Sequence, residues 1–241
     1  MTSNIPIPDG WGSDSLSQFL DATSHNTLAS VHQHREWYDQ IAAVDREFHC
    51  LADGLDDPEY PLAAIFVMRA HSAFLAATRV GLGTQLPESY MVLRGSLEAA
   101  LYGLYLAKHE DAQAVWMHRQ DNDDARAACR RRFQARTLSD YLKEIDPTTY
   151  VRYQRMYEWC IDLGAHPNAW SVAGHLSIDE SPAETSFVLR YLSMDLKERT
   201  VLFMHITRIG VIVLDVFSNL FRERFDRLGI TERLGVIKQV L

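Results

Sequence analysis

The chain has 241 residues, 47% of them hydrophobic and 23% charged, with a formal net charge of -8. This balance is typical of a globular protein with a buried core, and the length suits one large domain. The negative charge argues against non-specific binding to nucleic acid or to an anionic membrane. Cys50, Cys129 and Cys160 are widely spaced and form no Cys-x-x-Cys pair. We therefore expect no disulfide framework, and a reducing, cytoplasmic location is favoured.

The first segment, residues 1–13, is polar and rich in proline and glycine. It has no basic stretch followed by an apolar run, so we expect no signal peptide and predict a flexible segment. From Thr27 to Leu55, apolar residues recur at three- and four-residue steps, which predicts an amphipathic helix. Pro61 and Pro87 are each well placed to open a further helix, the first ending near Gly83.

The next part of the chain carries more charge. We expect Asp111 to Arg119 to form either a short helix or the start of the next one, and Asp121 to Ile145 to form a longer, mostly exposed helix. Asp146 and Pro147 supply an N-cap and a first-turn proline for a helix that reaches about Gly164.

Residues 166–191 interrupt the helical pattern with two prolines and a glycine. Short runs on either side of a turn-like stretch predict a small β-hairpin or loop excursion near residues 166–191. Ser193 is then expected to cap a last long helix that ends near Arg227. The fold prediction is a single all-α domain over residues 1–241, a multi-helix bundle with this one excursion.

Three of the predicted helices are apolar on nearly every side, yet each carries charge near its middle. A helix without a polar face is normally buried, and charged side chains are seldom fully buried without a partner. We therefore expect the charges to meet inside the bundle, either as a structural ion-pair network or as a small-ligand pocket. The residues concerned are Arg69, Arg94, Glu98, Arg208 and Asp215.

Two of these charges bear on membrane insertion. Arg208 and Asp215 lie inside the apolar stretch from Thr200 to Phe221, which is long enough to tempt a membrane-spanning interpretation. Each charge would be costly at bilayer depth, so we predict a buried bundle helix and no membrane association.

A second candidate for ligand binding is the stretch Asp162-Leu-Gly-Ala-His166-Pro-Asn168. The Asp162 carboxylate is close enough in sequence to orient the His166 imidazole, and a helix C-terminus there would favour the cationic imidazole. Alternatively, His166 and Asn168 only satisfy the carbonyl groups of a turn.

Standard catalytic and metal-binding motifs are absent from the sequence. It contains no Gly-x-Ser-x-Gly, Walker, Gly-x-Gly-x-x-Gly or His-Glu-x-x-His motif and no Glu-x-x-His pair. A metal-dependent hydrolase would need three protein ligands that the sequence does not place, so no metal and no cofactor are predicted. Seven histidines could in principle converge on a metal, but nothing in their spacing requires one: His32, His34, His71, His118, His166, His175 and His205.

The stretch Leu93-Arg94-Gly-Ser-Leu-Glu98-Ala, with Asp162 to Asn168 downstream, resembles a group of bacterial helical proteins near the HEPN nucleotide-binding superfamily. The resemblance covers about Pro61 to Leu220 and rests on short motifs. Ribonuclease members of that superfamily carry an arginine, then four to six residues, then a histidine. Arg199 and His205 have this spacing, and the resemblance implies a helical fold and, as an alternative, RNA cleavage.

Two functional hypotheses follow. The first is a non-enzymatic bacterial protein, a ligand-binding or regulatory module that binds an unknown small ligand at the charged cluster. It would form a homodimer through its apolar final helix. The alternative is a HEPN-like RNA-cleaving toxin or defence protein, the only case with RNA as a partner. In it, His205 acts as the acid–base group and Arg199 stabilises the transition state at a dimer cleft. The apolar neighbours Phe203, Met204 and Ile206 indicate instead a core position for His205.

Overall fold

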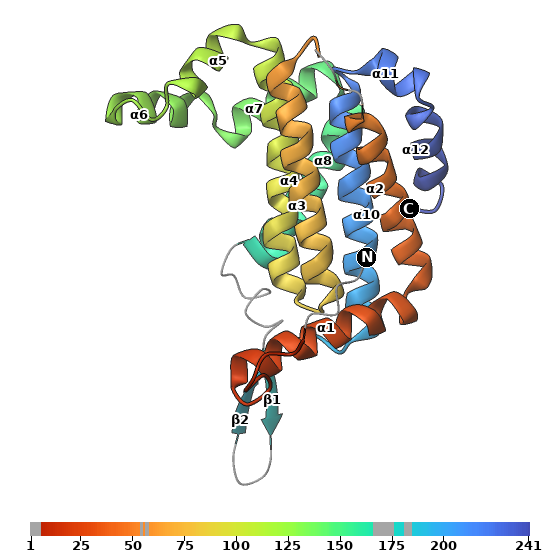
Figure 1. The fold of residues 1–241 in the computed structure, drawn as a ribbon. Helices are drawn as coiled ribbons and strands as arrows, with labels where there is room; N and C mark the ends of the chain where they lie inside the picture. The colour runs from red at the N-terminus through yellow and green to blue at the C-terminus, as the bar shows by residue number, and fades with distance from the viewer. Residues whose placement is uncertain (1–5, 54, 56–57, 166–175, 181–184) are drawn as a thin grey trace.

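The computed structural model describes residues 6–53, 55, 58–165, 176–180 and 185–241. Over this part of the chain the protein is a helical bundle, as predicted (Figure 1). Its elements are α1 (Ser15–Gln33), α2 (Arg35–Ala52), α3 (Pro61–Leu82), α4 (Leu86–Lys108), α5 (Glu110–Met117), α6 (Asp123–Arg132), α7 (Ala135–Ile145), α8 (Pro147–Cys160), the π-helical turn η1 (Ile161–Ala165), β1 (Leu176–Glu180), β2 (Thr185–Leu189), α10 (Leu196–Ser218), α11 (Arg222–Arg227) and α12 (Ile230–Lys238).

Helix α10 is the central element of the bundle and packs against α2, α3, α4, α8 and α12. Figure 1 shows it among the long helices, with α5 and α6 at one end of the molecule and the two strands at the other. The bundle closes tightly around Gly210. A Cβ atom at this position would lie 2.5 Å from Val44 Cγ1 on α2 and 2.7 Å from Phe74 Cε2 on α3. Only glycine therefore permits this approach of three helices.

Two helices, α3 and α10, are long and apolar enough to cross a membrane by length and composition, which is weak evidence for a span. In α10, 78% of the most apolar stretch is buried inside the chain, as expected for the core helix of a bundle. In α3 the corresponding share is 33%, so this helix leaves an apolar face exposed.

Several helix starts agree with the local signals in the sequence. Pro61 opens α3, Pro87 lies in the first turn of α4, and Pro147 opens α8. Asp146 caps α8 by accepting a hydrogen bond from the Thr149 amide at 2.9 Å. The cap of α10 is Asp195, which binds the amides of the first turn, rather than the predicted Ser193.

Three of the predicted helices are divided in the structure. The helix expected over Thr27 to Leu55 breaks at His34, whose ring packs edge-on against Phe203 of α10 at 5.1 Å. The exposed helix expected over Asp121 to Ile145 breaks at Phe133, which is buried against Tyr102. The last helix ends at Ser218, and α11 and α12 follow as separate elements. In the first two cases a tertiary contact of an aromatic ring accompanies the interruption.

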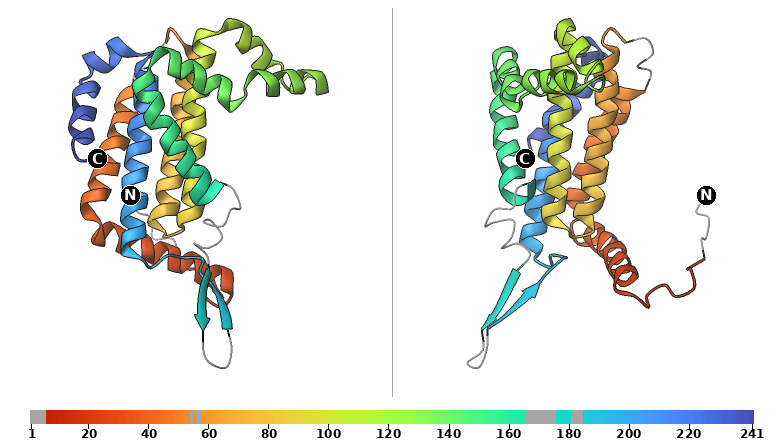
Figure 2. Two further views of the ribbon diagram at one scale, coloured as in Figure 1. Left: turned by 180° about the vertical axis from the view of Figure 1, so that it is seen from behind. Right: turned by 90° about the vertical axis from the view of Figure 1, so that its left-hand side faces the viewer.

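Strands β1 and β2 pair in antiparallel fashion, with Leu176 opposite Leu189 and Glu180 opposite Thr185. They lie within the excursion predicted near residues 166–191, and Figure 2 shows them projecting from one end of the bundle. Of the turn-like stretch predicted over residues 179–184, the first two residues lie in β1, and residues 181–184, like residues 166–175, lie outside the described residues.

Candidate functional site

The structure divides the predicted charged cluster into separate places. Arg94 and Glu98 lie between α4 and α8, whereas Arg208 and Asp215 lie between α10, α8 and α12. Arg69 is exposed and takes no part in either group. Of the second predicted stretch, Asp162 is exposed, while His166 and Asn168 lie outside the described residues.

The pair of Arg94 and Glu98 forms as predicted but is not buried in the core. Arg94 Nε donates to Glu98 Oε1 at 2.8 Å, and the Tyr157 hydroxyl donates to the same oxygen at 3.1 Å. The two side chains remain 29% and 40% exposed. The expectation of a buried pair is therefore wrong, because α8 covers this face of α4 only in part, through Tyr157.

Between α8, α10 and α12 lies a cavity of about 410 Å³. This basic cavity is lined by four cationic side chains, three aliphatic or thioether side chains and the end of the sequence. The lining residues are Arg152, Arg155, Met156, Arg208, Val211, Ile212, Lys238 and Leu241. In a chain of net charge -8, this is a strong local concentration of positive charge.

Asp215 balances only part of that charge. It is buried, and its two carboxylate oxygens bind Arg152 Nη1 and Lys238 Nζ, each at 2.8 Å. Arg208 donates to the main-chain oxygen of Leu241. Within the described part of the chain, no carboxylate side chain is paired with Arg155 or Arg208. The cavity therefore holds two guanidinium groups with unused hydrogen-bond donors.

The charges of Arg155 and Arg208 also affect pKa values at the cavity, including that of the neighbouring His205. Burial and the positive charge of Arg155 lower the pKa of Arg208. Burial, with the charges of Arg208 and Arg155, lowers the pKa of His205 to about 4. His205 is buried, its Nδ1 lies 2.9 Å from the Tyr90 hydroxyl, and Trp159 packs edge-on against its ring at 4.6 Å. His205 is therefore a neutral core histidine beside the cavity.

Arg199 belongs to a different neighbourhood of the bundle. Its Nη2 donates to Gln33 Oε1 at 2.5 Å at the end of α1, and its side chain is buried there. Burial lowers the pKa of Arg199. The partners of His205, Tyr90 and Trp159, come instead from α4 and α8. The two residues of the predicted ribonuclease motif thus have separate partners, and both side chains are buried within one chain.

Sequence reasoning found Arg208 and Asp215 but missed three of the cations that surround them. Arg152 and Arg155 are three residues apart on α8, so their common face was readable from the sequence. Lys238 follows at the end of α12. Nothing in the local pattern shows that α8 and α12 meet α10 at this point, because that depends on how the helices dock.

The histidines considered as metal ligands do not converge on one place in the described structure. Of those that the structure describes, only His71 lies in a group of possible ligands, and its companions are Asp45 and His49. The four-residue spacing of Asp45 and His49 places both on one face of a helix, a signal that the sequence alone carries.

Comparison of the chain with protein-family models, curated proteins and solved structures gives no match. The resemblance to bacterial HEPN-like proteins therefore stays a prediction.

Proposed function

We propose that the chain is a non-enzymatic binding module that holds a small organic anion in the basic cavity. The observation that carries this proposal is the placement of Arg155 and Arg208. Both face the same cavity, and among the described residues neither is paired with a carboxylate side chain. Two neighbouring guanidinium groups that no carboxylate side chain of the described residues neutralises can bind an anionic group by charge-assisted hydrogen bonds.

The other lining residues indicate what the anionic group is attached to. Met156, Val211 and Ile212 supply an apolar wall, which favours a hydrocarbon or aromatic body. The volume of about 410 Å³ suits a small molecule and is too small for a folded partner. We infer a ligand with one phosphate or carboxylate head and an apolar body.

A ligand in this cavity would also affect how α12 packs against the bundle. The cavity joins side chains of α8 and α10 to Lys238 near the end of α12. A ligand that bridges Arg155, Arg208 and Lys238 would hold α12 against the bundle, since binding to the folded state stabilises it. This is the regulatory element of the proposal. Bacterial origin and cytoplasmic location stay predictions from the sequence.

Calorimetric titration with phenyl phosphate at fixed ionic strength tests the proposal. We expect one molecule bound per chain, with weaker binding of inorganic phosphate, which lacks the apolar body. Benzoate distinguishes a carboxylate head from a phosphate head. Arg155→Gln and Arg208→Gln should each weaken binding at least about tenfold, because each removes a charge-assisted contact. Arg130→Gln is the matched control, since Arg130 is an exposed arginine on α6.

A second readout follows from His205. A bound anion would offset the charges of Arg155 and Arg208, so the pKa of His205 measured by NMR should rise from about 4. Equal affinity for phenyl phosphate in wild type and in both cavity variants would overturn the proposal. So would an unchanged pKa of His205 at saturation.

A further inference from the structure

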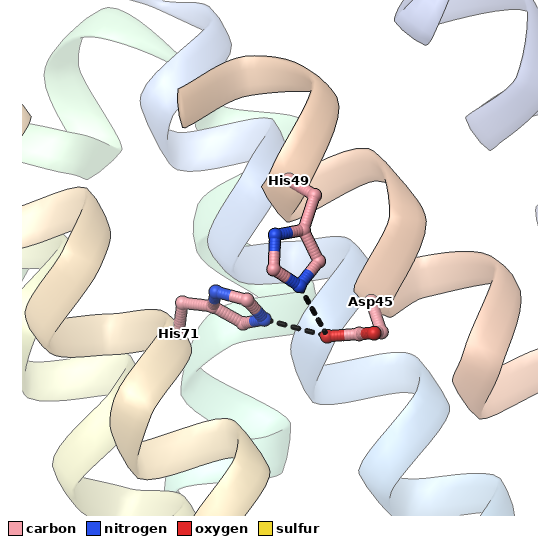
Figure 3. Close-up of side chains that lie close together, drawn as sticks. All are labelled: Asp45, His49 and His71. Carbon is pink, nitrogen blue, oxygen red and sulfur yellow. Dashed lines mark hydrogen bonds and ion pairs between the residues drawn. The ribbon is translucent and has the colours of Figure 1, made fainter. Parts of the chain in front are cut away.

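A second group of chemically active side chains lies between α2 and α3, away from the basic cavity. Asp45 and His49 are one helical turn apart on α2, and His71 lies in the middle of α3. Figure 3 shows the three side chains pointing toward one another, with both imidazole rings directed at one carboxylate oxygen. The group is independent of the residues used in the proposed function.

The distances within this group suit a single ion. His71 Nε2 lies 2.6 Å and His49 Nε2 3.8 Å from Asp45 Oδ1, and the ligand atoms all lie within 4.8 Å of one another. Metal–ligand bonds of about 2.0–2.2 Å place the ligand atoms of one ion about 3–3.5 Å apart. Small side-chain rotations would therefore bring the three ligand atoms within reach of one ion.

The packing around the group holds one ligand and leaves another free to adjust. The His71 ring stacks on Phe48 at 4.8 Å with an angle of 6° between the planes, and its side chain is 12% exposed. Phe48 is fully buried and contacts Phe74 in the core. The His49 side chain is 62% exposed. His71 is thus oriented by the core, as ligands of metal sites commonly are, while the side occupied by His49 opens to solvent.

A simple surface pair of aspartate and histidine looks different in this molecule. His118 Nδ1 and Asp121 Oδ2 lie 2.9 Å apart within one helical turn, and both side chains are more than half exposed. No third possible ligand joins them within the described residues. Asp45 and His71, in contrast, lie on two different helices. A hydrogen bond between these two residues does not explain why the His49 ring also points toward Asp45 Oδ1.

We propose that Asp45, His49 and His71 bind one divalent first-row transition-metal ion. Two imidazole nitrogens and one carboxylate oxygen favour zinc, iron, cobalt or nickel over magnesium and calcium, which prefer oxygen ligands. No fourth His, Cys, Asp or Glu of the described residues belongs to the group. The remaining coordination positions therefore face solvent and take water or an exchangeable ligand, as in open metal sites. The sequence alone predicts no metal site.

The test uses the full chain, stripped of metal with a chelator and then titrated. Binding of Zn²⁺ is followed by calorimetry, and binding of Co²⁺ by its visible absorption bands. We expect one ion per chain. His49→Gln is the decisive variant, because its exposed side chain can be changed without disturbing the core. We expect it to weaken binding at least about 100-fold. Replacing a residue that only orients a ligand already weakens binding by up to about 100-fold, and His49 is itself a ligand. Asp45→Asn, which keeps the shape but removes the charge, should have a similar effect.

His118→Gln is the matched control, since it removes a histidine paired with an aspartate at a site without a third ligand. It should leave binding unchanged, and so should Arg208→Gln in the basic cavity. Absence of stoichiometric binding overturns the proposal. Equal weakening by His118→Gln and His49→Gln overturns it as well, because the ion would then be held by scattered surface histidines.

Discussion

Arg233 on α12 donates to both carboxylate oxygens of Glu47 on α2, through Nε and Nη2, each at 2.7 Å. The Glu47 side chain is 5% exposed, whereas that of Arg233 is 48% exposed. The hydrogen bonds to Glu47 raise the pKa of Arg233. This two-point ion pair neutralises a carboxylate that would otherwise be buried alone between the two helices.

We predict that Arg233→Ala lowers the free energy of unfolding by about 3 kcal/mol, because it leaves the Glu47 carboxylate buried without its partner. Urea denaturation measures the change. Arg35→Ala is the control: Arg35 pairs with Asp39 at 3.0 Å, but the two side chains are 68% and 53% exposed. It should cost less than about 1 kcal/mol. Equal losses in the two variants would contradict the prediction.

We expect Arg94→Ala to lower the free energy of unfolding much less than it would if the pair of Arg94 and Glu98 were buried, as the sequence predicts. Its partner Glu98 is 40% exposed and keeps the hydrogen bond from Tyr157. We expect a loss of about 1 kcal/mol or less in the free energy of unfolding. A loss of about 3 kcal/mol or more, measured in the same denaturation experiment, would show that the pair is buried after all.

The buried position of His205 predicts a pH dependence of stability. Its pKa is about 4 in the folded chain, whereas an ordinary histidine has a pKa of about 6.5. Between these values the unfolded chain binds a proton that the folded chain does not, so stability falls as the pH drops from 6.5 to 4. The full difference is about 3 kcal/mol. His205→Gln should lack this contribution, and denaturation curves of both proteins over this pH range measure it.

The same geometry predicts that the purified protein does not cleave single-stranded RNA. His205 is neutral and bonded to Tyr90, and Arg199 is bonded to Gln33 elsewhere in the bundle. A gel assay with a labelled oligonucleotide tests this, and His205→Ala should change stability rather than activity. Cleavage by the wild type that is lost in a folded His205→Ala variant would restore the RNA-cleaving alternative.

The homodimer predicted from the sequence needs a different surface, because α10 is buried within the chain. We place the surface on α3, where Ile65, Met68 and Leu75 are 52%, 57% and 44% exposed. Light scattering at micromolar concentration should give a dimer mass for the wild type and a monomer mass for Met68→Lys. Met117→Lys on α5, at an equally exposed methionine, should remain a dimer. A monomeric wild type would contradict the prediction.

The starts of α3 and α8 were predictable from the sequence because their signals are local. Pro61, Asp146 and Pro147 act within one turn of the helices that they begin. The breaks at His34 and Phe133 were not predictable, because they coincide with contacts to rings on distant helices.

The same distinction between local signals and helix docking applies to the candidate site. The common face of Arg208 and Asp215 follows from their seven-residue spacing on one helix. The approach of Arg155 does not, since it depends on how α8 docks against α10. Likewise, the spacing of Asp45 and His49 was visible in the sequence, but the position of His71 opposite them depends on how α2 and α3 align.

Gly210 connects these observations in another way. Its missing side chain lets Val44 on α2 and Phe74 on α3 both touch the backbone of α10. Asp45 follows Val44 directly, and His71 lies one turn before Phe74. The close packing of α2 and α3 against α10 at Gly210 therefore helps to set the distance between the Asp45 carboxylate and the His71 imidazole. A methyl group at position 210 would push against Val44 and Phe74. We therefore expect it to change the distance between Asp45 and His71, although it would contact neither of these side chains.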